Sequence, residues 1–414
     1  MEQNKTLKRC KAPWFETILT GSDRITATPC CYLPADKFEI NSVDDLDFLT
    51  TWNSKNFKLA RLVNTNNATE RNSTKNNFCA NCVYYDTNNN LDLFYHLCND
   101  IEQFVDDDLT QEQKDNYELA MSEYEQGKIE LQSTPIFFSA MQGINCNLNC
   151  RMCFQRNETP NECDKDKFKD KISAESILKL KPYLKKALWI TLIGGDPFAI
   201  PEAVKLLKVL VSDPDFKTVR ISLWSNAIMI DKYFDLLKQH PKITLFTSPD
   251  SLGYTYEYIR RGAKWNKFEA NVKEFQKISK ENNLKWNVKC HNLLMKSSID
   301  KIGEYASWCV ENDIEACFSL LCSIPWKNEF CDQEDVISNP KLLDSVLNWD
   351  KKLDRAIEIF EKSGNQNVAV DSLIYYKKQI ENAYQNPPKP KSKSKIIREI
   401  NRFLNRLKNK HKNN

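Results

Sequence analysis

The feature that most constrains the fold is a regular alternation of short apolar runs with amphipathic segments in the middle of the chain. Apolar runs of strand length recur six times, and we predict strands at 136–141, 188–193, 219–223, 243–247, 285–291 and 315–321. Helical periodicity fills the intervals, and we predict helices at 174–187, 202–211, 232–239, 268–281 and 299–311. Strands that alternate with helices form a parallel sheet with right-handed crossovers. The sequence therefore predicts an α/β fold with its functional residues at the carboxyl ends of the strands.

A loop with three cysteines follows the first predicted strand. Cys146, Cys150 and Cys153 lie within eight residues, with three and then two residues between them. A structural zinc site normally takes four ligands in two separated pairs, and three thiols in one short loop cannot all form disulfides. Four-iron clusters usually take four cysteines, so three thiolates leave one iron open to a ligand that is not protein.

Further motifs follow the second, third and fourth predicted strands. One is a Gly-Gly-Asp-Pro run at 194–197, which carries two of the nine glycines of the chain. The others are Ser-Asn at 225–226 and Ser-Pro-Asp at 248–250, and the latter is followed by Tyr-Glu-Tyr-Ile-Arg at 256–260. The residues expected to meet at this edge are Gly194, Gly195, Asp196, Pro197, Ser225, Asn226, Ser248, Asp250 and Arg260.

Together these motifs resemble those of the radical S-adenosylmethionine (SAM) superfamily. The Cys-x3-Cys-x2-Cys run is the signature of that superfamily, and the run at 194–197 resembles its Gly-Gly-Glu-Pro motif, with Asp196 in place of Glu. Residues 225–227 resemble its Thr-Asn-Gly motif, with Ser for Thr and Ala for Gly. Residues 248–250 and 256–260 resemble its ribose-binding Ser-x-Asp segment and the helix start beside it.

The resemblance implies a partial (β/α)6 barrel with a [4Fe-4S] cluster on Cys146, Cys150 and Cys153. It implies that the open iron and the residues collected above bind SAM, with Arg260 on the SAM carboxylate. A surface ion pair between Arg260 and Glu257 is the alternative. An electron from a donor such as flavodoxin or ferredoxin would then break the sulfonium and yield a 5′-deoxyadenosyl radical. That radical abstracts a hydrogen atom from the substrate.

The fifth predicted strand has a polar face with Asn287, Lys289 and His291. Buried parallel strands are usually apolar on both faces, so this face is expected to border the substrate. A structural, hydrogen-bonded role for His291 is an equal alternative. Four later cysteines lack paired metal spacing, and nothing selects one as a hydrogen-atom donor or another residue as catalytic; they are Cys309, Cys317, Cys322 and Cys331.

The first hundred residues form a second cysteine-rich region. Strands are predicted at 15–19 and 25–28, as a hairpin between Cys10 and the adjacent Cys30 and Cys31. The region resembles the SPASM/Twitch module that accompanies many radical SAM enzymes, although that module more often follows the barrel. The resemblance implies a second [4Fe-4S] cluster, with Cys31 as the alternate to Cys30, and a structural zinc site is the other reading. The implied ligands are Cys10, Cys30, Cys79 and Cys82.

The predicted organisation has five parts. They are a small cysteine-rich module (1–104), a solvated helical connector (105–134), the partial barrel (135–325), C-terminal helices (326–386), and a basic linker with an amphipathic helix (387–414). From Lys389 onward, seven Lys and three Arg stand against one Glu, a charge of +9, so with a net charge of +3 the remainder carries −6. The basic helix is expected to bind an acidic partner or to dock on the acidic body.

Composition and the absence of apolar segments bear on the cellular compartment, and the motifs above bear on the class of substrate. No apolar leader opens the sequence and no run of about 18 apolar residues occurs, so no transmembrane segment is expected. Fifteen cysteines without a leader predict a cytoplasmic metal or redox protein. The favoured substrate is a peptide or protein that undergoes modification. The alternatives are a small metabolite such as a sugar or nucleotide, and a zinc-stabilised protein that binds nucleic acid.

Overall fold

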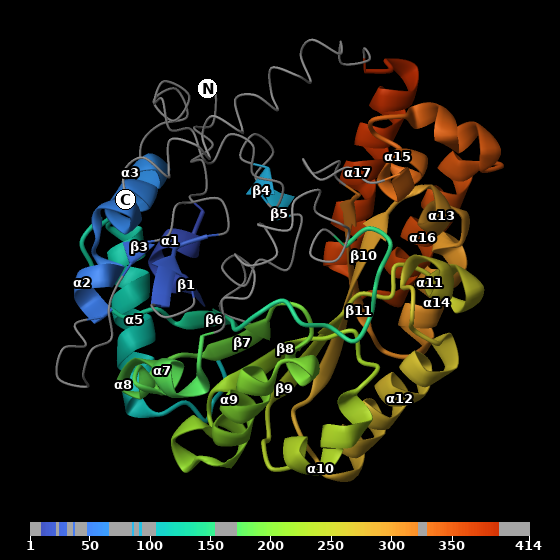
Figure 1. The fold of residues 1–414 in the computed structure, drawn as a ribbon. Helices are drawn as coiled ribbons and strands as arrows, with labels where there is room; N and C mark the ends of the chain where they lie inside the picture. The colour runs from blue at the N-terminus through green and yellow to red at the C-terminus, as the bar shows by residue number, and fades with distance from the viewer. Residues whose placement is uncertain are drawn as a thin grey trace, which may run out of the picture.

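The chain folds around one large sheet (Figure 1). The computed structural model describes residues 10–21, 25–30, 36–37, 48–65, 85–86, 91–92, 105–153, 172–321 and 329–388. Within them the sheet has nine strands in the order β11-β10-β9-β8-β7-β6-β1-β2-β3, and β4 pairs with β5 separately. Strands β6 to β11 are all parallel and adjacent in chain order. Because right-handed crossovers link such strands, all their carboxyl ends meet at one edge.

The six predicted strands of the parallel sheet are confirmed, with ends within three residues of those expected. They are β6 (Phe137–Met141), β7 (Trp189–Ile193), β8 (Arg220–Trp224), β9 (Ile243–Thr247), β10 (Asn287–Leu294) and β11 (Glu315–Leu320). The N-terminal strands are β1 (Glu16–Gly21), β2 (Ile25–Thr28), β3 (Asp36–Lys37), β4 (Tyr85–Asp86) and β5 (Leu91–Asp92).

Helices between the strands lie along the outer side of the curved sheet (Figure 1). They are α7 (Ala174–Leu178), α8 (Lys181–Leu184), α9 (Pro201–Ser212), α10 (Phe234–Leu237), α11 (Gly253–Ile259), α12 (Trp265–Glu281), α13 (Lys296–Asp300) and α14 (Ile302–Glu311). Three predicted helices are broken. The helix at 174–187 divides into α7 and α8 because Pro182 has no N–H and suits only a first turn. The helix at 232–239 begins as a 3-10 turn (Ile230–Tyr233), and that at 299–311 is interrupted at Lys301.

The parallel sheet has two chemically different faces. The outer face carries apolar side chains such as Phe138, Ile190 and Ile221, which belong to the hydrophobic core. The alternate residues form the inner face, where Ser139 is in register with Thr191 and Thr191 with Ser222. Successive residues of a strand point to opposite faces, so this alternation fixes which side chains reach the helices.

The N-terminal hairpin is part of the main sheet. The predicted pairing is confirmed, since β1 and β2 are antiparallel. Strand β1 also pairs in parallel with β6, with Glu16 opposite Phe137. Helix α1 (Ala12–Phe15) precedes β1, and its Trp14 and Phe15 are fully buried. The hairpin therefore extends the barrel sheet, although the sequence places it in a separate module.

Buried Arg61 holds the N-terminal helices together. It lies on α3 (Lys55–Thr65) and donates hydrogen bonds to the carbonyl oxygens of Pro13, of Ile129 and of Trp52 in α2 (Phe48–Trp52). Its guanidinium also lies 4.5 Å from the centre of the Trp52 ring. Burial lowers the pKa of Arg61 to about 9, against the opposing effect of Glu123. One cation thus satisfies carbonyl groups from three separate segments.

The connector contains the predicted helix, α5 (Gln111–Glu125), which exposes one face to solvent and docks the other on the body of the protein. Its buried positions carry polar side chains that bond backbone groups. Gln113 donates to Ala187 O, and the Glu123 carboxylate accepts from the N–H groups of Gln132 and Ser133. Hydrophobic periodicity does not mark these buried positions, because their side chains are polar.

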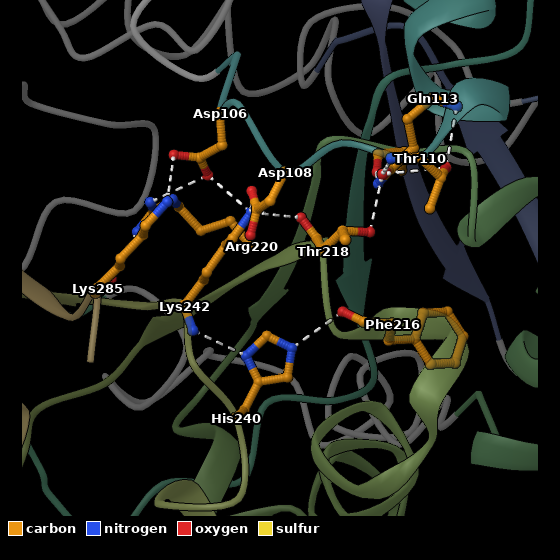
Figure 2. A network of polar contacts seen from close by, with 11 residues as sticks. Asp106, Asp108, Thr110, Gln113, Phe216, Thr218, Arg220, His240, Lys242 and Lys285 are labelled. Atoms are coloured by element: carbon orange, nitrogen blue, oxygen red, sulfur yellow. Dashed lines mark hydrogen bonds and ion pairs between the residues drawn. The ribbon is translucent and has the colours of Figure 1, made fainter. Parts of the chain in front are cut away.

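A charged cluster closes the amino end of the parallel sheet (Figure 2). Asp106 lies 3.5 Å from Arg220 at the start of β8, 3.0 Å from Lys242 before β9 and 3.6 Å from Lys285 before β10. The Lys242 side chain is fully buried and also pairs with Asp108 at 2.5 Å. We call Asp106, Asp108, Arg220, Lys242 and Lys285 the floor cluster, because it ties the connector to the starts of three strands.

The C-terminal helices are α15 (Glu329–Glu334), α16 (Trp349–Ser363) and α17 (Asn367–Gln385). A 3-10 turn (Pro340–Ser345) precedes α16. Among the residues with described structure, no helix is both long and apolar enough to cross a membrane. The basic amphipathic helix predicted near the end of the chain lies outside the described residues.

Candidate functional site

The cysteine loop packs tightly on the Gly-Gly loop that follows β7. Gly195 N–H donates to Gly143 O over 3.1 Å, and Asp196 N–H donates to Asn145 O over 2.8 Å. A Cβ atom at Gly194 would overlap Gly143 O, and one at Gly195 would overlap Asn145 O. Only glycine lets the two backbones approach this closely. The two motifs predicted to share a site are therefore in direct backbone contact.

The other side of the cysteine loop is bonded to the segment after α11. Asn149 N–H donates to Arg261 O over 2.9 Å, and Arg151 N–H donates to Ile259 O over 3.0 Å. The Arg151 side chain donates from Nε to Tyr258 O over 2.7 Å, and its guanidinium lies 4.5 Å from the Tyr258 ring centre. Hydrogen bonds to backbone groups therefore hold the cysteine loop on both sides.

Two of the three thiols have hydrogen-bond donors aimed at them. Cys146 Sγ accepts from Leu148 N–H at 3.4 Å and from Asn226 Nδ2 at 3.5 Å. Cys150 Sγ accepts from Arg260 Nη1 at 3.8 Å. Donors of this kind stabilise thiolates and are the usual surroundings of cluster sulfurs. The donor set of this loop therefore fits an iron–sulfur cluster.

The thiols do not form a site for a single metal ion. In the described part of the chain, no three His, Cys, Asp or Glu side chains converge on a point that could hold one ion. A four-iron cluster places each thiolate on a different iron, so its ligands need not converge. This arrangement is consistent with cluster binding by Cys146, Cys150 and Cys153.

Asp196 links two loops of the carboxyl edge. The side chain is fully buried, and its carboxylate accepts from Ser225 Oγ at 2.8 Å, from Asn226 N–H at 2.9 Å and from Phe198 N–H at 3.0 Å. Burial raises the pKa of this carboxyl, while the three donors act in the opposite direction. In this structure Asp196 positions Ser225 and Asn226, and the next residue, Ala227, has φ 60° where the resembled motif has glycine.

Arg260 and Asp250 form a buried ion pair. Arg260 Nη2 lies 2.5 Å from Asp250 Oδ2, and Asp250 is fully buried. Burial lowers the pKa of Arg260, but Asp250 and Cys150 together raise it above its ordinary value, so the side chain stays cationic. Arg260 Nε lacks a hydrogen-bond partner among the described residues. The alternative pairing with Glu257 is wrong, because Glu257 pairs with Lys264.

The remaining motif residues also lie at the carboxyl edge. Pro197 begins a 3-10 turn (Pro197–Ala199) after Asp196, and Ser248 directly follows β9 with its side chain partly accessible. On β10, Asn287 accepts from Thr244, Lys289 pairs with Glu315, and His291 bonds Ser319 Oγ at 2.7 Å. Burial lowers the pKa of His291 to about 3, so it is neutral. The polar face predicted for this strand is therefore engaged with neighbouring strands.

Comparison with known proteins covers the part of the chain that contains this site. The family model of the radical SAM superfamily matches residues 143–295, which include the cysteine loop and the loops bonded to it. This part of the chain therefore resembles the enzymes of the radical SAM superfamily. This finding favours radical SAM chemistry over the hypothesis of a zinc-stabilised protein that binds nucleic acid. The α/β fold, with a mostly parallel sheet like the partial barrel of radical SAM enzymes, is confirmed as predicted.

Solved structures show a distant likeness. SuiB from Streptococcus suis bound to S-adenosylmethionine has 17% identity and a TM-score of 0.39, over 51% of this chain and 46% of that one. SuiB bound to precursor peptide SuiA has 16% identity and a TM-score of 0.38, over 77% and 65%. The anSMEcpe protein with AdoMet and the Cp18Cys peptide has 17% identity and a TM-score of 0.36, over 56% and 61%. The chain thus spans less than two thirds of each, and no curated protein matches it by sequence.

The N-terminal cysteines are only partly described. Cys10 precedes α1 and Cys30 follows β2, and both thiols are partly accessible. Cys31, Cys79 and Cys82 lie outside the described residues, so the second cluster stays a prediction. Other thiols in the described barrel and C-terminal helices are buried; they are Cys290, Cys309, Cys317 and Cys331.

Proposed function

We propose that this radical SAM enzyme abstracts a hydrogen atom from a peptide or protein and thereby modifies it. The observation that supports the chemistry is the cysteine loop, bonded on one side to the Gly-Gly loop and on the other to the Arg260 segment. A cluster and SAM bound there would supply the reductive cleavage that generates a radical able to attack an unreactive carbon.

The residues of the chain have separate tasks in this proposal. Cys146, Cys150 and Cys153 would hold three irons, and hydrogen-bond donors lie at the sulfurs of Cys146 and Cys150. Gly194 and Gly195 carry no side chains, which would leave room for SAM to approach the loop. The cationic Arg260 favours the SAM carboxylate, which adds to its pairing with Asp250.

Support for a peptide substrate comes from the N-terminal cysteines, whose spacing resembles a module found in many peptide-modifying members of the superfamily. We propose that Cys10, Cys30, Cys79 and Cys82 bind a second [4Fe-4S] cluster, with Cys31 as alternate, and that a small electron-transfer protein supplies electrons. Two of the distantly similar proteins bind peptides, since SuiB was solved with precursor peptide SuiA and anSMEcpe with the Cp18Cys peptide. A sugar or nucleotide substrate is the competing hypothesis.

Alanine substitution of each barrel cysteine tests the chemistry. Cys146→Ala, Cys150→Ala and Cys153→Ala should each abolish reductant-dependent formation of 5′-deoxyadenosine, because one iron loses its ligand. The matched control is Cys309→Ala, a buried thiol behind the sheet that should keep the activity. Product formation by any of the three loop variants at the rate of the control would contradict the cluster assignment.

Deuterium transfer tests the substrate class. A fully deuterated short peptide encoded beside the gene would be incubated with the reconstituted enzyme, SAM and reductant. Deuterium in 5′-deoxyadenosine, with a matching mass change in the peptide, is the expected result. Transfer from a labelled sugar or nucleotide, and none from the peptide, would favour the competing hypothesis.

A further inference from the structure

Backbone hydrogen bonds place Cys150 opposite Arg260. The cysteine loop and the segment that ends α11 run in opposite directions here, and the N–H groups on either side of Cys150 donate to the carbonyl groups on either side of Arg260, over 2.9 and 3.0 Å. Arg260 N–H also donates to Tyr256 O over 2.7 Å, which fixes the end of the helix. The main chain therefore holds the two residues opposite each other, independently of their side-chain rotamers.

The guanidinium of Arg260 connects a carboxylate to a thiol. Its Nη2 atom lies 2.5 Å from Asp250 Oδ2, and its Nη1 atom donates to Cys150 Sγ over 3.8 Å. A guanidinium has a planar fork of N–H groups that can contact two partners at once, and it stays charged in proteins. An anion, a cation and a ligand sulfur are thus joined by direct contacts.

Asp250 is anchored in the loop after β9. Its side chain is fully buried, and its Oδ1 atom accepts from Leu293 N–H of β10 over 3.0 Å. Its φ of 60° lies in the left-handed region, which residues other than glycine adopt uncommonly and at some cost in free energy. The carboxylate that pairs with Arg260 is therefore tied to two neighbouring strands of the sheet.

The charge of its donor distinguishes Cys150 from Cys146. The described donors to Cys146 Sγ are neutral, namely a backbone N–H and the side-chain amide of Asn226, whereas the donor to Cys150 is a cation. Reduction of an iron–sulfur cluster adds one negative charge, and its potential depends on nearby charge and on hydrogen bonds to its sulfurs. A cation in contact with one ligand sulfur stabilises the reduced state more than the oxidised state.

We propose that Arg260, through its contact with Cys150, raises the reduction potential of the cluster bound by the cysteine loop, and that Asp250 limits this rise. The Arg260 cation favours the added electron, and the Asp250 carboxylate opposes it. The pair therefore sets how strong a reductant the enzyme needs. This inference rests on the proposed function, because it concerns the cluster of the same site. It gives Arg260 a task in the absence of SAM, in addition to binding the SAM carboxylate.

A redox titration of the enzyme without SAM tests the proposal. The full chain would be reconstituted anaerobically and reduced in steps, and the reduced cluster would be measured by electron paramagnetic resonance. The signal of the loop cluster is the one that disappears in the triple alanine variant of Cys146, Cys150 and Cys153. At a fixed potential, Arg260→Gln should lower the ratio of reduced to oxidised cluster about tenfold or more, a shift of about 59 mV for one electron.

Further variants separate the effect of charge from damage to the fold. Asp250→Asn removes the opposing anion and should raise the ratio, whereas a structural defect should shift it in the same direction as Arg260→Gln. Arg260→Lys keeps the charge and should retain the ratio within about threefold. The double variant of Arg260→Gln and Asp250→Asn removes both members of the buried pair and should lie between the two single variants. The matched control is Arg261→Gln, which removes the exposed neighbouring arginine and should leave the ratio unchanged.

The outcomes distinguish this inference from the proposed function. Equal ratios in Arg260→Gln and Arg261→Gln, or shifts of the same sign in Arg260→Gln and Asp250→Asn, would overturn the inference and leave the cluster assignment intact. A signal that the triple alanine variant retains in full would show that the cysteine loop holds no cluster, and the proposed function and this inference would both fail. SAM affinity, measured by equilibrium dialysis, reports on the other task of Arg260. A loss of that affinity in Arg260→Gln without a shift in the ratio would assign the residue to SAM alone.

Discussion

At the scale of single residues, backbone contact decides which side chains the carboxyl edge tolerates. Gly194 and Gly195 lie against the carbonyl groups of Gly143 and Asn145, where any side chain would overlap. Asp196 then joins the loop after β7 to the loop after β8 through Ser225 and Asn226. The geometry of the site therefore depends on two positions that admit no side chain, Gly194 and Gly195, and on one hydrogen-bond acceptor, the Asp196 carboxylate.

Gly195→Ala tests this argument. The added Cβ meets backbone oxygen atoms that cannot move as a flexible side chain would, so the Gly-Gly loop must shift from the cysteine loop. We expect loss of detectable 5′-deoxyadenosine formation and a fall of about 1–3 kcal/mol in the free energy of unfolding, measured by denaturant titration. Gly303→Ala, in α14 with no atom closer than 3.7 Å, is the control and should be neutral or stabilising. Equal behaviour of the two variants would contradict the tight packing.

At the scale of elements, the floor cluster fixes how the connector meets the barrel. Asp106 contacts the starts of β8, β9 and β10, and α5 follows directly after it. Burial raises the pKa of the Asp106 carboxyl, but Lys242, Arg220 and Lys285 lower it more, so it lies below the ordinary 3.8. A carboxyl whose folded pKa is lowered stabilises the fold above its unfolded pKa, and the stabilisation disappears as pH falls through the folded value.

Asp106→Asn should therefore cost about 1–3 kcal/mol at neutral pH, because buried Lys242 loses one of its two carboxylates. The difference from the unmodified protein should shrink as the pH falls below the ordinary pKa of 3.8 and through the lower pKa of the folded state, where the Asp106 carboxyl becomes protonated. Denaturant titrations at several pH values measure both effects. Asp107→Asn removes the exposed neighbouring carboxylate and should change stability by less than about 0.5 kcal/mol. A pH-independent loss in Asp106→Asn would refute the ion-pair explanation.

At the scale of the whole molecule, the N-terminal region is built into the barrel. Strand β1 pairs with β6, Phe48 of α2 packs on Phe138 with ring centres 5.8 Å apart, and Arg61 bonds the connector at Ile129. Segments joined by a shared sheet and core are expected to unfold together. Two of the predicted ligands of the second cluster, Cys10 and Cys30, flank elements of this shared structure.

Iron content tests the two-cluster organisation. If Cys10, Cys30, Cys79 and Cys82 hold a second cluster, anaerobic reconstitution of the full chain should give about eight irons per chain. The triple alanine variant of Cys146, Cys150 and Cys153 should keep about half of them. Iron and acid-labile sulfide analysis measures both values. Zinc in place of half of the iron would refute the second cluster and leave the barrel cluster unaffected.

The sequence by itself determined the parallel sheet and the position of the cysteine loop. The apolar pattern of a strand is a local property of the sequence, because it depends only on whether one or both faces of that strand are buried. The order of strands and helices then brings the loops after β6, β7, β8 and β9 to one edge. The loops that carry the predicted site residues lie together for this reason.

Tertiary structure alone decided which partners the polar residues take. The Asp196 carboxylate accepts hydrogen bonds from Ser225 and Asn226, and Arg260 pairs with Asp250 rather than with Glu257. Sequence spacing favours partners three or four residues apart on a helix, whereas these contacts join different loops. The place of Glu16 on the inner face depends on β1 pairing with β6 across more than a hundred residues. This pairing depends on how the whole sheet packs around a shared core. Residues far apart in the sequence form that core, so a short segment of sequence does not predict the pairing.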